Sequence, residues 1–206
     1  MGWAVTDSHR VHFESPTAER EVAECIEMAI RRLGVPRRRL LYMCIGTDRS
    51  TGDALGPLVG ERLAPAIEEL DGLVDVLGTL RDPIHAANLP EALRECCLRE
   101  PAPAVVAIDA CLGRVETVGM VTIGVGPLSP GAGVNKALPA VGSAFVTGTV
   151  NVGGFMEYFV LQNTRLHLVM QMAELIANGL ARGARNAFAA GRSAAAPLPV
   201  LASGGG

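Results

Sequence analysis

Residues 40–63 read LLYMCIGTDRSTGDALGPLVGERL, and in this segment a buried strand passes through a polar loop into a helix. The unbroken apolar run at residues 40–45 is typical of a strand that is covered on both faces. From Leu55 onward apolar residues recur at helical spacing, and Pro57 suits the first turn of a helix. Pro65 is expected to kink or shorten that helix. The segment therefore predicts a strand–loop–helix unit of an α/β fold.

The rest of the chain repeats this alternation of strands and helices. Further strands are predicted at residues 73–77, 104–108, 115–125 and 145–152, and further helices at residues 15–33, 89–98 and 155–180. The last helix is expected to turn six apolar side chains inward, namely Phe159, Leu166, Val169, Met170, Ala173 and Ile176. This order predicts a three-layer α/β/α sandwich with a mostly parallel central sheet.

One domain is predicted between two loose ends. Residues 1–14 show no periodicity and are expected to form a flexible N-terminal arm. Residues 189–206 are dominated by Ala, Ser, Pro and Gly and are expected to form a disordered tail. Residues 15–188 then make up a single domain, as expected for a chain of 206 residues.

Composition excludes several classes of partner. The chain is 49% hydrophobic, carries a formal net charge of -3 and has no basic block, so we expect neither a nucleic-acid nor a membrane partner. Two uncharged runs, at residues 117–135 and 137–156, are interrupted by glycines and prolines and do not predict a membrane-spanning helix. Five cysteines with no CxxC spacing and no apolar signal core indicate a cytoplasmic protein. The last helix is compatible with a homodimer.

The polar loop at residues 46–57 follows a strand at the edge where open α/β sheets place their ligands. It lacks the Gly-Lys-Ser/Thr ending of a phosphate loop, and Asp48 and Asp53 would repel a phosphate, so nucleotide binding is disfavoured. Asp53 has two interpretations, as the N-cap of the helix or as a functional carboxylate. Asp48 is either a turn residue or a contact to substrate.

Asp109 follows the strand at residues 104–108, within a stretch to residue 156 that holds only four charged residues. A carboxylate there carries a desolvation cost, which makes it a functional candidate. Because the strands at 40–45 and 104–108 are expected to be neighbours, Asp53 and Asp109 could face each other across one cleft. Such a pair either shares a proton and activates water or holds a divalent metal. His85 is either a third metal ligand or a structural residue.

Two glycine-rich segments could line a groove for an extended peptide, because glycine allows a backbone to approach closely. They could equally be tight connections of the fold. The candidate substrate-binding residues in them are Gly131, Gly133, Asn135, Lys136, Asn151, Gly153 and Gly154. A Gly-x-Ser-x-Gly motif is absent, and no histidine stands near Cys44 or Cys111 in the sequence, which disfavours a serine or cysteine nucleophile.

Four motifs together resemble the YyaC-like sporulation proteins of spore-forming Firmicutes, and the likeness covers roughly residues 40–177. They are MCIGTDRSTGDALGPLVG at 43–60, IDACLG at 108–113, PGAGVNK at 130–136 and NVGGFME at 151–157. A more distant resemblance, to the spore germination protease and the hydrogenase maturation endopeptidases, implies a phosphorylase/peptidase-like α/β fold. In the germination protease the two matching aspartates are associated with peptide hydrolysis. In the maturation endopeptidases the matching acidic positions contact nickel, assisted by a histidine for which this chain has no identified match.

The resemblance implies a cytoplasmic peptidase of sporulation, acting in the mother cell or the forespore on a peptide or protein substrate. Asp53 and Asp109 would activate the attacking water, and loop amides could stabilise the oxyanion. The alternative is a catalytically inactive, protease-like protein that binds a peptide or protein partner. A divalent metal held by Asp53, Asp109 and His85 is a third interpretation.

Overall fold

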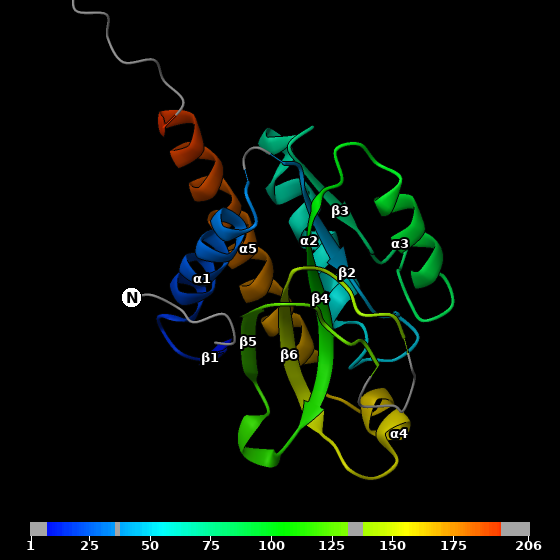
Figure 1. Cartoon of the computed structure of the whole chain (residues 1–206). Coiled ribbons are helices and arrows are strands. Elements are labelled where there is room, and N and C mark those ends of the chain that lie inside the picture. Colours follow the sequence, from blue (N-terminus) through cyan, green and yellow to red (C-terminus); the bar gives the residue numbers. More distant parts are fainter. Residues whose placement is uncertain (1–7, 36–37, 132–137, 195–206) are drawn as a thin grey trace, which may run out of the picture.

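The computed structural model describes residues 8–35, 38–131 and 138–194, and of residues 191–194 only the helical backbone. A six-stranded sheet runs through the molecule in the order β1-β5-β6-β4-β2-β3, with helices on both of its faces (Figure 1). The strands are β1 (Ser8–His12), β2 (Leu40–Cys44), β3 (Val74–Leu77), β4 (Ala104–Gly113), β5 (Met120–Val125) and β6 (Ala144–Val152). The helices are α1 (Ala18–Arg32), α2 (Leu55–Ala66), α3 (Leu89–Cys97), α4 (Glu157–Gln162) and α5 (Leu166–Ala194), with short 3₁₀ turns η1 (Glu68–Leu70) and η2 (Val115–Thr117).

Four strands, β3, β2, β4 and β6, run parallel, and β5 and β1 continue the sheet in antiparallel pairing. This arrangement confirms the α/β sandwich and the neighbouring positions of the strands at 40–45 and 104–108. The pairing of β2 with β4 ends at Cys44 and Ile108, so Asp109 is the first residue of β4 beyond β2. The carboxyl end of the parallel strands is therefore where Asp109 and the start of α2 meet.

Two apolar layers cover the sheet. The larger one buries side chains of α1, α2 and α5 against one face, and the smaller one buries side chains of α3 against the other. In the larger layer α5 packs against both α1 and α2. The approach is close between α1 and α5, because a Cβ added at Gly179 would lie 2.5 Å from Cγ1 of Val22.

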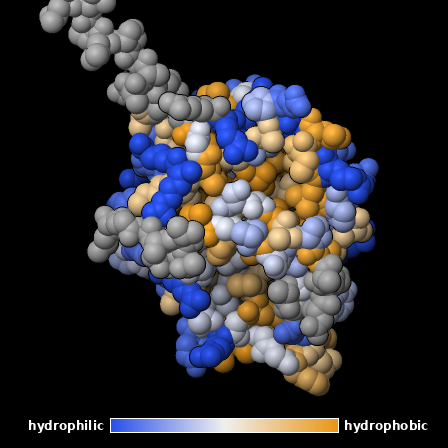
Figure 2. Space-filling view, viewed as in Figure 1, coloured by the Kyte–Doolittle hydropathy of each residue, from blue (hydrophilic) through white to orange (hydrophobic). Residues whose placement is uncertain are grey.

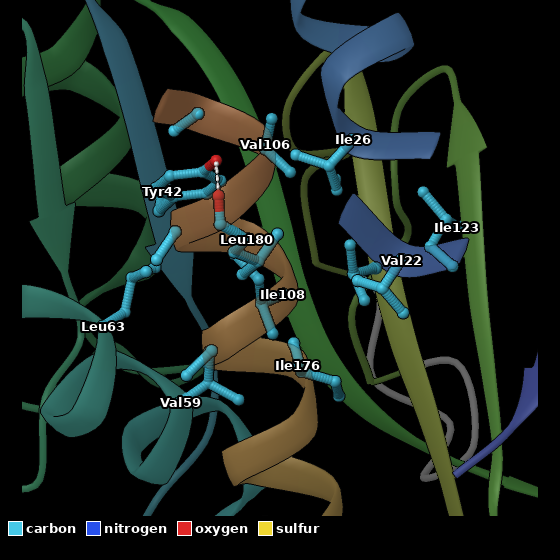
Figure 3. Close-up of a cluster of buried hydrophobic side chains, with 14 of the residues drawn as sticks. Val22, Ile26, Tyr42, Val59, Leu63, Val106, Ile108, Ile123, Ile176 and Leu180 are labelled. Atoms are coloured by element: carbon cyan, nitrogen blue, oxygen red, sulfur yellow. Dashed lines mark hydrogen bonds between the residues drawn. The ribbon is translucent and has the colours of Figure 1, made fainter. Parts of the chain in front are cut away.

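Tyr42 links the sheet to α5 inside the larger layer (Figure 3). Its side chain is fully buried and its hydroxyl donates a hydrogen bond to the carbonyl oxygen of Leu180 at 3.2 Å. We expect Tyr42→Phe to lower the free energy of unfolding by about 1 kcal/mol, because the hydrogen bond is lost while the ring packing is kept. Urea denaturation measures this change. Tyr158→Phe, at a tyrosine that is 67% exposed, is the matched control and should leave stability unchanged; equal stability of both variants would contradict the role of Tyr42.

Residues 8–12 correct the expected flexible arm, because they form a strand. Ser8–His12 forms β1, which pairs with β5 at the edge of the sheet. An edge strand is held by backbone hydrogen bonds, and only Val11 of β1 is buried, so the sequence shows no apolar alternation here. The ring of His9 also contacts the carboxylate of Glu21 in α1 at 2.7 Å. Residues 1–7 lie outside the described residues.

Two further expectations at the chain's second half are corrected. The strand predicted at 115–125 begins only at Met120, because η2 and a turn at Gly119, with φ of +88°, precede it. The predicted tail at 189–206 is helical as far as residue 194, since α5 continues to Ala194; the remainder lies outside the described residues.

The helix predicted at 155–180 is two helices, α4 and α5, that meet at residues 163–165. Val169, Ala173 and Ile176 are buried as expected. Because α4 lies beyond the end of the sheet, Phe159 is 55% exposed, and Leu166 and Met170 at the start of α5 are also exposed. At the break, Thr164 donates its hydroxyl hydrogen to the carbonyl oxygen of Val160. None of the helices in the described part of the chain combines the length and apolar character needed to cross a bilayer.

Candidate active site

A tight turn after β2 places Asp53 at the end of the sheet. The backbone at Gly46 has φ of +142°, and a Cβ there would lie 2.0 Å from the carbonyl oxygen of Asp53. That same oxygen accepts a hydrogen bond from the backbone N–H of Thr47 at 3.2 Å. Ala54, and not Asp53, occupies the N-cap position of α2. The loop thus fixes the backbone of Asp53 against the turn, and the half-buried Asp53 lines the cavities beyond the end of β2.

Asp109 is a buried carboxyl group, with 6% of its surface exposed. Its Oδ1 accepts the backbone N–H of Ala110 at 2.8 Å. Burial, and next the negative charge of Asp53, raise the pKa of Asp109 well above its ordinary value, while backbone hydrogen bonds from Ala110 and Gly131 act in the opposite direction. The charge of Asp53 thus acts on Asp109, and both aspartates line the same two cavities.

Two cavities meet at this pair. The larger, of about 310 Å³, and the smaller, of about 180 Å³, share four lining residues: Asp53, Asp109, Gly131 and Leu161. The larger cavity extends toward Arg49, His85 and Tyr158. The smaller extends along β4 past Ala110, Cys111 and Leu112. We call the two together the cleft; its carboxyl pair lies where the halves join.

The other predicted site residues fall in three places. Gly131 lines both halves of the cleft, whereas Asp48 is exposed and lines neither. Asn151 and Gly153 line another cavity, beside Phe155 and Phe159, and Gly154 lines neither half of the cleft. Gly133, Asn135 and Lys136 lie outside the described residues.

The side chain of Asn151 forms hydrogen bonds at α4 and does not line the cleft. Its side-chain amide donates to the carbonyl oxygen of Val160 at 3.3 Å and to Oγ1 of Thr164 at 3.2 Å. Its own Oδ1 accepts the backbone N–H of Val152 at 2.8 Å. These bonds hold the end of β6 against α4, which itself lines the cleft through Tyr158 and Leu161.

Sequence reasoning did not single out the α4 wall of the cleft. Tyr158 falls inside one long predicted helix, and the available sequence signal was the cluster of aromatic residues Phe155, Tyr158 and Phe159. Ser50 also lines the larger cavity; its buried Oγ has no hydrogen-bond partner among the described residues. Ser50 is inside the polar loop, but nothing in the pattern distinguishes it from a turn residue.

The described residues do not fit a metal centre. Among them, no three His, Cys, Asp or Glu side chains are grouped so that they could hold a metal ion. His85 lines the larger cavity, but its Nδ1 accepts the backbone N–H of Ala87 at 3.3 Å. Its backbone N–H donates to Oδ1 of Asn88 at 2.8 Å. His85 lines the larger cavity with Asp53 and Asp109, but these three side chains are not grouped as a ligand set in the described part of the chain.

Comparison with known proteins gives relatives for most of the chain. A family model described as "Protein of unknown function (DUF1256)" matches residues 10–179. "Uncharacterized protein YyaC" of Bacillus subtilis (strain 168) is 51% identical over 164 residues, which cover 79% of this chain and 77% of that protein. This match confirms the resemblance to YyaC-like proteins. Among solved structures, the [NiFe] hydrogenase maturation protease HycI from Thermococcus kodakarensis KOD1 aligns with 75% of this chain and 97% of its own, with a TM-score of 0.37 and 19% identity.

Proposed function

We propose that this chain, which belongs to the family described as protein of unknown function DUF1256, hydrolyses peptide bonds in the cleft at Asp53 and Asp109. The observation that carries the proposal is the buried Asp109, whose pKa is raised by burial and by Asp53, at the junction of two cavities. Two carboxyl groups whose environments push their pKa values apart can divide the roles of acid and base.

In the proposed reaction Asp53 is the base and Asp109 the acid. The Asp53 carboxylate takes a proton from a water molecule as the water oxygen bonds to the peptide carbonyl carbon. Asp109 donates its proton to the carbonyl oxygen, which gives a neutral tetrahedral intermediate. The C–N bond then breaks, the amine leaves with the proton held by Asp53, and the hydroxyl returns a proton to Asp109. Both carboxyl groups end in their starting states.

Cys111 is not the nucleophile in this proposal, although it lines the smaller half of the cleft. Burial raises the pKa of its thiol above the ordinary value, and its Sγ lies 3.4 Å from Oγ1 of Thr149. The thiol therefore remains protonated, whereas nucleophilic cysteines are thiolates.

We place the activity in the cytoplasm of a sporulating cell, in the mother cell or the forespore. The support is the resemblance of the four motifs to sporulation proteins, together with the absence of CxxC spacing among the cysteines. The substrate is then a polypeptide made during sporulation.

Asp53→Asn should lower the rate of cleavage by about 10²- to 10⁴-fold, because the amide cannot accept the proton of water. The measurement is mass spectrometry of peptides released when the purified protein is added to a protein extract of sporulating cells. Asp48→Asn is the matched control, since it makes the same change at an exposed aspartate outside the cleft and should cleave normally.

Equal release of peptides by the wild type and Asp53→Asn would show that the mechanism is wrong. Capture of one intact polypeptide by the wild type, retained by Asp109→Asn, would identify instead a protease-like binding protein. An exposed apolar group at the turn into α4, where Phe155 and Met156 are 81% and 58% exposed, favours that second function (Figure 2).

A further inference from the structure

β4 continues past its neighbour on one side. On the β2 side its pairing stops at Ile108, whereas on the β6 side it continues to Gly113. The chain leaves β2 because Gly46 turns away, and the backbone N–H of Gly46 donates to the carbonyl oxygen of Ile84. In the described part of the chain, residues 109–113 of β4 thus form a sheet edge in the middle of the sheet, beginning at Asp109.

The direction of the backbone groups on this edge follows from four hydrogen bonds. On the β2 side, the N–H of Ala104 donates to Arg39 and the carbonyl oxygen of Ile108 accepts from Ile45. On the β6 side, the carbonyl oxygens of Val105 and Gly113 accept from Ser143 and Gly153. Successive residues of a strand turn their N–H and C=O groups to opposite sides. Even-numbered residues up to Ile108 therefore face the β2 side. The β4–β6 pairing is irregular between Cys111 and Leu112, but the carbonyl oxygen of Gly113 still faces β6, so the same alternation places Ala110 and Leu112 on the β2 side.

Ala110 and Leu112 are the even-numbered residues beyond β2. The N–H of Ala110 is used by the carboxylate of Asp109, which leaves the C=O of Ala110 and both backbone groups of Leu112 directed to the open side. Both residues are half-buried and line the smaller half of the cleft, of about 180 Å³. Edge groups of this kind form a template for another strand.

We infer that an extended polypeptide segment binds in the cleft as an additional strand, hydrogen-bonded to β4 at Ala110 and Leu112 along the line that β2 vacates. The inference rests on the proposed function and names the form in which the substrate is recognised. In strand addition the affinity comes from main-chain hydrogen bonds, so the amino-acid sequence of the bound segment matters little. Because Asp109 begins the edge, a segment paired with Leu112 brings a peptide bond to the carboxyl pair.

The inference defines a substrate class. The cleft should take segments that are unfolded or loosely held, because a helix already uses its own N–H and C=O groups. Proline at the residue facing Leu112 should be rejected, since it has no N–H to donate. Side chains on both sides of the scissile bond should matter less than the extended conformation.

The test measures amide hydrogen exchange by NMR in the Asp53→Asn protein, with and without a pool of capped decapeptides of mixed sequence. Asp53→Asn keeps the β4 edge and prevents consumption of the probe. We expect exchange of the Leu112 amide to slow by about tenfold or more on addition of the pool, as for an N–H that gains a hydrogen bond. Amides of β1, at the far edge of the sheet, should not change. An unchanged Leu112 amide under saturating peptide would overturn the inference.

A pair of variants gives an independent measurement. Leu112→Pro removes the edge N–H without removing a bond to β6, which is where a strand tolerates proline. Leu112→Ala keeps the N–H and changes only the side chain. In the Asp53→Asn background, which does not consume the pool, Leu112→Pro should lower affinity for the pool by about tenfold, and Leu112→Ala by much less. Equal losses in both variants would count against backbone pairing, and if Leu112→Pro does not fold, the exchange measurement decides.

The two proposals fail separately. Protection of Leu112 by the pool, with no cleavage by the wild type, would support strand addition and reject the peptidase. Cleavage by the wild type without protection of Leu112 in Asp53→Asn would support the peptidase and reject strand addition.

Discussion

Asp109→Asn should abolish measurable cleavage, with a loss of about a thousandfold, while the protein remains folded and at least as stable at neutral pH. Activity falls because an amide cannot donate the proton that the carbonyl oxygen receives. Stability is kept because asparagine has the same shape and its Oδ1 can still accept the N–H of Ala110. It also carries no charge, and a buried carboxylate is costly to ionise. Peptide release and thermal unfolding, measured on the same preparation, separate the two effects.

The difference in stability between the wild type and Asp109→Asn should change with pH in one direction. Because burial and Asp53 raise the pKa of Asp109 in the folded state, the folded protein holds a proton that the unfolded chain releases near pH 3.9. The proton on Asp109 contributes fully to the free energy of unfolding below that pH. This contribution decreases as the pH rises above about 4, and it continues to decrease until the pH passes the raised pKa of Asp109 in the folded state. The wild type should thus lose stability relative to Asp109→Asn over this range; a constant difference between them would show that Asp109 is not perturbed.

Gly56→Ala should destabilise the protein by about 3 kcal/mol or more and reduce cleavage in the fraction that folds. A Cβ at this position would lie 2.0 Å from the carbonyl oxygen of Ile45 and 2.8 Å from its backbone nitrogen. Both neighbours are backbone, so no side chain can rotate away. The start of α2 must move from the end of β2, and Asp53, three residues earlier, moves with it.

Gly72→Ala is the matched control for Gly56→Ala. Nothing lies within 4 Å of a Cβ at Gly72, but its φ is +75°, so alanine there should cost only about 1 kcal/mol of backbone strain. Urea denaturation of both variants, with cleavage assays at a temperature where both are folded, measures the difference. A Gly56→Ala protein as stable as Gly72→Ala would contradict the close contact between α2 and β2.

The parallel part of the fold could be predicted because its signals are local. β2 is an apolar run followed by a helical pattern, and burial on both faces is what its composition predicts. β1 could not be predicted, because it depends on hydrogen bonds to β5, more than a hundred residues away in the chain. The break between α4 and α5 was missed for a similar reason, since the apolar spacing continues across Thr164 and only the end of the sheet decides which side chains are covered.

Some residues of the candidate site could likewise be predicted from the sequence, and others could not. Asp53 and Asp109 could be paired from the sequence because both follow strands whose carboxyl ends share an edge. Asn151 and Gly153 were assigned to the same groove on composition, but Asn151 is near the end of β6, Gly153 follows it, and both line another cavity beside Phe155 and Phe159. The open edge of β4 has no sequence signal, because it exists only where β2 stops and β4 does not.

The packing of α5 between α1 and α2 makes the larger apolar layer depend on segments that are far apart in the chain. α1 leaves the ribosome early and α5 follows the whole sheet, so the larger apolar layer stays open until synthesis has passed residue 180. Contacts between such distant segments form slowly, since a long loop must close first. Until α5 is in place, α2 lacks one of the helices that it packs against, and the loop that carries Asp53 directly precedes α2. The position of Asp53 therefore depends on the completed packing of α5, although α5 follows it by more than a hundred residues.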